Sequence, residues 1–237
     1  IPRYDPFFSA DLWAYLQGDL KHTIETQLNP TKPVIVGGFE GTHGDMAPAM
    51  PYKQSGYIWS RNVGSGIAKE AWGLFDSLGE SLSADTEITI ASRHINMREQ
   101  PEINGVSICD APSIGTPLTA APFEHESPFF GWMPYFKNGS KSWFFNEGCQ
   151  GNKSILGGEF LQSLVEPKKN FPNDILFQVI QLGNLVIAPL PFELTAETGV
   201  RIEKAIQASY QQAGEKQPQV MVTSLANGYT GYITTPE

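Results

Sequence analysis

The stretch Ile175–Gly199, ILFQVIQLGNLVIAPLPFELTAETG, decides the fold of this chain. It contains two apolar runs, then a Pro-rich turn, then the start of a helix. Gly183-Asn184 separates the two runs and is a favoured two-residue hairpin turn. The stretch therefore predicts two antiparallel strands followed by a helix.

One carboxylate, Glu193, lies between the second predicted strand and the helix. Pro189 and Pro191 keep the backbone before it stiff and extended. Thr195 is predicted to be the N-cap of the helix. Proteins of the α/β class often bind ligands where a strand ends beside a helix N-terminus. The alternative is an exposed acid that interacts only with the positive end of the helix dipole.

Length and composition bound the class of protein. The chain has 237 residues, of which 41% are hydrophobic and 17% charged, as in an ordinary globular protein. A net charge of −9 argues against a nucleic-acid partner, because phosphate binding needs clustered Lys and Arg. No apolar run approaches the ~20 residues of a membrane span, and Ile1 opens no signal-peptide pattern.

Two segments before the hairpin have helical periodicity. The first is a helix capped near Ser9, and the second spans residues 62–79. Their apolar positions repeat at helical spacing: Leu12, Tyr15, Leu16, Leu20 and Ile24 in the first, and Val63, Ile67, Trp72, Leu74 and Phe75 in the second.

Further strands and a helix complete the expected fold. Lys32–Gly38 predicts a short buried strand, Glu87–Ser92 alternates like a strand, and Gln219–Ser224 predicts the last strand. Thr195–Ala213 predicts the helix after Glu193. Together these elements predict an α/β fold with a mixed sheet flanked by helices.

Residues 96–156 are rich in Pro, Gly and aromatic side chains without a clean period. One interpretation is an irregular excursion that packs its own small core. The other is an apolar wall for a lipid tail or a membrane-facing surface. The two interpretations do not exclude each other.

Three short motifs occur in a specific order along the chain: Gly44-Asp45-Met46-Ala47-Pro48, then PFELTAETG at 191–199, then NGYTGYITTPE at 227–237. With these motifs the chain resembles the neutral/alkaline (non-lysosomal) ceramidase family, whose members are zinc-dependent and cleave the amide bond of ceramide. The resemblance implies an α/β catalytic domain with its metal site at strand ends. It also implies that residues 1–237 are the C-terminal part of that domain, with an N-terminal part of the same protein missing.

The resemblance also implies roles for individual residues. Family members hold zinc with two histidines, one glutamate and one tyrosine, and the last two map to Glu193 and Tyr232. Carboxylate and phenolate oxygens beside imidazoles suit this metal. The family's catalytic turn maps to Gly44, Asp45 and Ala47, and its serine is replaced here by Ala47. Alanine has no hydroxyl and is neither a nucleophile nor an acid.

Two classes of function therefore stay open. The first is a zinc-dependent hydrolase that acts on ceramide or another N-acyl lipid. The second is a degenerate homologue that binds lipid or metal without turnover. The family resemblance further implies a secreted, periplasmic or surface location and peripheral contact with a membrane, and it leaves open whether Cys109 and Cys149 are bridged. His43, in the loop before Gly44, is expected to be a hydrogen-bonding residue, with a metal role as the alternative. His94, after a strand, is expected to cap the sheet, with a position facing the site as the alternative.

Overall fold

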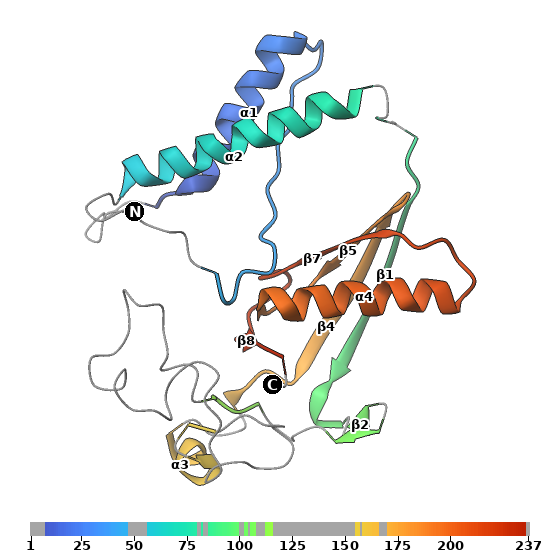
Figure 1. Cartoon of the computed structure of the whole chain (residues 1–237). Coiled ribbons are helices and arrows are strands. Elements are labelled where there is room, and N and C mark those ends of the chain that lie inside the picture. The colour runs from blue at the N-terminus through green and yellow to red at the C-terminus, as the bar shows by residue number, and fades with distance from the viewer. Residues whose placement is uncertain are drawn as a thin grey trace. The chain divides into compact units, whose positions relative to one another are not determined.

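The computed structural model describes residues 8–46, 56–79, 82, 85–99, 102–103, 105–107, 112–115, 155–156, 158–165 and 170–235. The chain divides into two compact units. One comprises Ile1–Phe39 with Pro48–Thr86, and the other comprises Glu40–Ala47 with Glu87–Glu237. Each unit is described by itself below (Figure 1).

The first unit is a pair of helices, α1 (Leu12–Leu28) and α2 (Tyr57–Leu78). Small residues make the contact. Ser60, Gly64 and Ala68 are the buried positions of α2, one turn apart. A methyl group added at Gly64 would collide with the backbone of Leu12 and the side chain of Tyr15, so α1 and α2 approach as closely as glycine allows.

The sequence predicted both helices correctly but not the face that α2 buries. Helix α2 begins five residues before the expected start. Ile67 and Leu74, expected inside, are 45% and 70% exposed. The strand predicted at Lys32–Gly38 is wrong: this segment has no regular structure, and Ile35 is 93% exposed. An apolar run forms a strand only when a neighbouring strand pairs with it, and none of the described strands does so.

The second unit is built on a four-stranded mixed sheet with the order β1-β4-β5-β7. Strands β1 (Ile88–Asn96), β4 (Asp174–Leu182) and β5 (Leu185–Pro189) are antiparallel neighbours. β5 and β7 (Gln219–Thr223) are parallel. The predicted hairpin at Gly183-Asn184 is confirmed, and Gly183 takes the positive φ of 57° that the turn needs.

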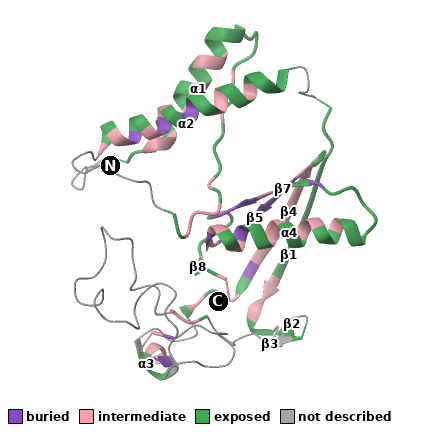
Figure 2. Cartoon of the chain, viewed as in Figure 1, coloured by how far each residue is buried: buried purple, intermediate pink, exposed green. Residues whose placement is uncertain are grey.

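Helix α4 (Ala196–Gln212) connects the parallel strands and packs on the sheet (Figure 1). Its apolar residues Ile202 and Ile206 contact a buried cluster formed by Ala188, Leu190, Leu194 and Val222. In the sheet, residues 186–189 of β5 and Val222 and Thr223 of β7 are buried (purple in Figure 2), whereas β1 is largely exposed. The α/β class with a mixed sheet and helices is thus confirmed.

The remaining described elements are short: a 3-10 turn at Met97–Glu99, strands β2 (Glu102–Ile103) and β3 (Val106–Ser107), and helix α3 (Gly158–Val165). The aromatic residues at 123–145, Cys109 and Cys149 lie outside the described residues. No helix in the described part of the chain is both long and apolar enough to cross a membrane.

Candidate functional site

Two very short strands assemble the site beyond the carboxyl ends of β5 and β7. Strand β6 (Glu193–Leu194) pairs in parallel with β8 (Tyr232–Ile233), and Glu193 is the register partner of Tyr232. Register partners on neighbouring strands project from the same face of a sheet. The two residues that the sequence predicted as metal ligands, 39 positions apart in the chain, are therefore direct neighbours.

Backbone hydrogen bonds fix this pairing. The N–H of Leu190 donates to Thr223 O at 2.9 Å, which extends the β5–β7 contact past the last strand residue. Further bonds run from the N–H of Glu193 to Gly231 O at 3.0 Å and from the N–H of Thr195 to Ile233 O at 3.1 Å. Leu194 itself is almost fully buried. The two segments that carry the site therefore form one stiff unit anchored in the core.

The segment before Ala47 docks against the same strands. The Glu40 carbonyl accepts hydrogen bonds from the Thr223 hydroxyl at 2.8 Å and the Ser224 N–H at 3.0 Å. Gly44 N–H donates to Leu194 O at 2.7 Å. A methyl group at Gly44 would lie 2.9 Å from Glu193 O, so only glycine allows this approach.

Asp45 caps the helix that follows Glu193. Its Oδ1 accepts a hydrogen bond from the N–H of Ala196 at 2.8 Å. Thr195 occupies the predicted N-cap position, but its side chain makes no capping bond and lies 2.8 Å from the Thr198 hydroxyl. Gly199 leaves room for Thr42, whose side chain would collide with any methyl group there. Asp45, which the family resemblance placed among the catalytic positions, thus joins the loop to α4.

The carboxylate of Glu193 lies close to the polar side chains of Tyr229 and His43. Its Oε1 accepts a hydrogen bond from the Tyr229 hydroxyl at 2.7 Å. Its Oε2 lies 3.9 Å from His43 Nε2, and His43 Nδ1 lies 2.9 Å from Gly41 O. Since a carbonyl only accepts, that bond requires a proton on Nδ1. His43 is thus the hydrogen-bonding residue that the sequence favoured.

Glu193 also changes the ionisation of both tyrosines. The pKa of Tyr232 is raised to about 12, first by hydrogen bonding to Glu193, then by burial, and then by the charges of Glu193 and Tyr229. The pKa of Tyr229 is raised by the same kinds of cause, with the hydrogen bond to Glu193 largest. A carboxylate beside a phenol favours the neutral phenol.

These residues fit part of a zinc site. A carboxylate and a phenol facing each other offer two oxygen donors of the kind that zinc accepts. The described residues contain no group of three or more His, Cys, Asp or Glu side chains placed to hold a metal ion. A four-donor site at Glu193 and Tyr232 would need two further donors, and His43 Nε2, 3.9 Å from Glu193 Oε2, is one nitrogen close to it. Ala47, where the family resemblance places a serine, lies outside the described residues.

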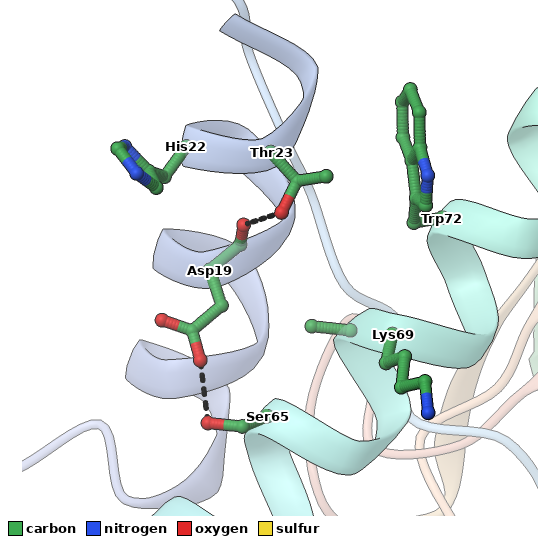
Figure 3. Close-up of a pocket in the computed structure, with 7 residues that line it drawn as sticks. Asp19, His22, Thr23, Ser65, Lys69 and Trp72 are labelled. Atoms are coloured by element: carbon green, nitrogen blue, oxygen red, sulfur yellow. Dashed lines mark hydrogen bonds between the residues drawn. The ribbon is translucent and has the colours of Figure 1, made fainter. Parts of the chain in front are cut away.

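The other described histidines are not at this site. His94 pairs with Asp174 at 3.2 Å, and both side chains are mostly exposed. His22 lies in the helical unit, beside a shallow hollow between α1 and α2 (Figure 3). There Asp19 accepts a hydrogen bond from the Ser65 hydroxyl, and Thr23 donates to the Asp19 carbonyl at 2.8 Å. The Ser65–Asp19 bond joins α2 to α1, whereas the Thr23–Asp19 bond lies within α1.

Comparison with known proteins identifies the family. The sequence profile of "Neutral/alkaline non-lysosomal ceramidase, N-terminal" matches residues 40–237. The chain belongs to this family. Over 89 residues it is 36% identical to neutral ceramidase A of Dictyostelium discoideum and 34% identical to neutral ceramidase of Pseudomonas aeruginosa. Each match covers 38% of this chain and 12% of the relative.

Solved ceramidase structures share the fold. The crystal structure of neutral ceramidase from Pseudomonas aeruginosa matches 98% of this chain with a TM-score of 0.57 and 21% identity. A structure described as ceramidase complexed with C2 matches with a TM-score of 0.58 and 19% identity. This chain spans only 36% and 37% of those two chains. The resemblance inferred from the motifs is confirmed at the level of family and fold.

Sequence reasoning missed two contacts at the site. It quoted Tyr229 within the motif but gave it no role, and it did not connect Asp45 to α4. The spacing of Tyr229 and Tyr232 in the motif was the signal that could have indicated the contact between Tyr229 and Glu193. Gly228 and Gly231, both with positive φ, let the chain turn between strand β7 and strand β8. No local signal links Asp45 to Ala196, because they are 151 positions apart.

Proposed function

We propose that this chain forms part of a zinc-dependent amide hydrolase that cleaves ceramide or a related N-acyl lipid into a sphingoid base and a fatty acid. Family membership supports the hydrolase class and a ceramide-like substrate. The observation that carries the proposal is the pairing of Glu193 with Tyr232 across β6 and β8.

In this proposal Glu193 and Tyr232 supply two of the zinc ligands. Zinc supplies Lewis acidity, which polarises an amide carbonyl and acidifies water. The chain's own residues position the reactants. Glu193 contributes negative charge, and the docked turn holds Gly44 against the backbone of Glu193 and Leu194. Backbone N–H groups in that turn do not depend on side-chain identity, so replacement of serine by Ala47 leaves them in place.

A second candidate is favoured by one observation in the sequence. Ala47 and Ala49 stand where the family motif carries serine and asparagine. Two losses within one motif are expected in a homologue that binds lipid or metal without turnover. Glu193 and Tyr232 are both retained, which argues against a homologue that binds only lipid, because such a protein need not keep metal ligands.

The deciding experiment compares the complete natural protein with its Ala47→Ser variant in a ceramide cleavage assay with zinc present. If the family's hydroxyl is required, the parent cleaves slowly and Ala47→Ser raises the rate. A single positioned hydrogen-bonding group is worth about 10²–10³ in rate, or about 2.7 to 4 kcal/mol. Ala47→Ser combined with Ala49→Asn tests whether both positions must revert.

Each outcome separates the two candidates. Cleavage by the parent that does not change with Ala47→Ser supports a hydrolase that works without the serine. Cleavage that appears only in a variant supports a recently lost activity. No cleavage by the parent or by either variant would refute the hydrolase and favour the binding protein.

A further inference from the structure

Tyr229 donates a hydrogen bond to Glu193, the carboxylate on which the proposed zinc site depends. The sequence analysis assigns Tyr229 no role. We propose that Tyr229 is a positioning residue: its hydroxyl holds Oε1 of Glu193 and leaves Oε2 as the oxygen that binds the metal. This inference rests on the proposed function, because it concerns the same site.

The backbone directly after Tyr229 is bonded to the segment that carries Glu193. Its neighbour Thr230 donates to Pro191 O through both its N–H and its hydroxyl, each at 2.8 Å. The carbonyl of the next residue, Gly231, accepts the N–H of Glu193 at 3.0 Å. Tyr229 is therefore tied to the same short segment that carries Glu193, and its hydroxyl reaches the carboxylate without a flexible link.

The two carboxylate oxygens of Glu193 have different surroundings. Oε1 accepts the 2.7 Å bond from Tyr229, a length typical of a charge-assisted O–H···O⁻ bond. Oε2 lies 3.9 Å from His43 Nε2, which is too long for a hydrogen bond. The oxygen that already accepts a strong bond is the poorer metal donor. Glu193 therefore presents Oε2.

Burial separates this role from simple packing. The Glu193 side chain is 18% exposed, whereas Tyr229 is 56% exposed. Replacing Tyr229 by phenylalanine removes only the hydroxyl of a ring that lies at the surface. A structural contribution would be small, so a large effect on metal binding would come from the lost hold on Glu193.

The test is zinc affinity in the complete natural protein, measured by competition with a chromogenic chelator. Tyr229→Phe should raise the zinc dissociation constant about 10- to 100-fold, the usual effect of losing a hydrogen-bond partner of a metal ligand. Tyr210→Phe is the matched control, since Tyr210 also donates its hydroxyl to a side chain, Gln181 Oε1 at 2.9 Å, but sits on α4. This control should bind zinc like the wild type.

Thermal unfolding of the zinc-free proteins supplies the second readout. Tyr229→Phe and Tyr210→Phe should unfold at similar temperatures. Equal zinc affinity in Tyr229→Phe and the wild type would overturn this inference but not the proposed function. A larger loss of thermal stability in zinc-free Tyr229→Phe than in the control would also overturn it, by showing a structural role. Absence of zinc binding by the wild type would overturn the proposed function and this inference together.

Discussion

Gly44→Ala tests whether the loop before Ala47 is docked on the candidate site. The added methyl group would lie 2.9 Å from Glu193 O and 3.0 Å from Leu194 C and O. These are backbone atoms anchored in the core, so the loop must move, and the 2.7 Å bond from Gly44 N–H to Leu194 O must lengthen. Overpacking of this kind costs about 1 to 3 kcal/mol.

Gly41→Ala is the matched control in the same loop. A methyl group at Gly41 meets nothing within 4 Å. The substitution should be neutral or stabilise the protein by about 0.4 to 1 kcal/mol, because alanine restricts the unfolded chain. Both variants share this unfolded-state effect, so the difference between them measures the collision at Gly44.

The assay is urea unfolding followed by circular dichroism, with hydrogen exchange of the peptide covering residues 40–46 as the local probe. Gly44→Ala should be less stable than Gly41→Ala by about 1 to 3 kcal/mol. It should also exchange faster in that peptide. Equal stability and equal exchange in the two variants would refute the docked loop.

Three further predictions concern the site. Tyr232, with its pKa raised to about 12, should ionise well above the ordinary value near 10 in an absorbance titration. The stabilisation that neutral Tyr232 gains from Glu193 should be complete below pH 10 and lost between pH 10 and about 12. Glu193→Gln should lower the midpoint of the Tyr232 titration; an unchanged midpoint would contradict the interaction between Glu193 and Tyr232. Asp45→Ala should destabilise the chain by about 0.5 to 2 kcal/mol through loss of the cap on α4, measured by urea unfolding, and an unchanged midpoint would show that the cap is not formed. The isolated 237-residue chain should bind zinc weakly, because the described residues offer no cluster of three metal-binding side chains of the His, Cys, Asp and Glu types; tight stoichiometric binding by calorimetry would contradict this.

The elements that could be predicted from the sequence are those with a local cause. The hairpin at Gly183-Asn184 follows from a turn dipeptide between two apolar runs, and α4 follows from helical periodicity after an N-cap position. The predicted strand at Lys32–Gly38 failed because strand formation depends on a partner that local sequence does not specify. The burial of α2 was misassigned because its contact with α1 uses small residues rather than large apolar ones.

At the site, the sequence analysis paired Glu193 with Tyr232 for a reason that was not geometric. Glu193 and Tyr232 were connected by the order of motifs in a family, and the β6–β8 register then explains how they meet. The bonds from Tyr229 to Glu193 and from Ala196 to Asp45 depend on long-range packing of loops. Such contacts leave no periodic signal in a single sequence.

The most direct test of the account is anomalous X-ray diffraction at the zinc edge from crystals of the complete natural protein grown with zinc. The account predicts one zinc peak about 2.0 to 2.2 Å from a carboxylate oxygen of Glu193, with the Tyr232 hydroxyl oxygen also bound to it. A zinc ion bound elsewhere in the protein, with Glu193 and Tyr232 contacting only each other, would contradict it.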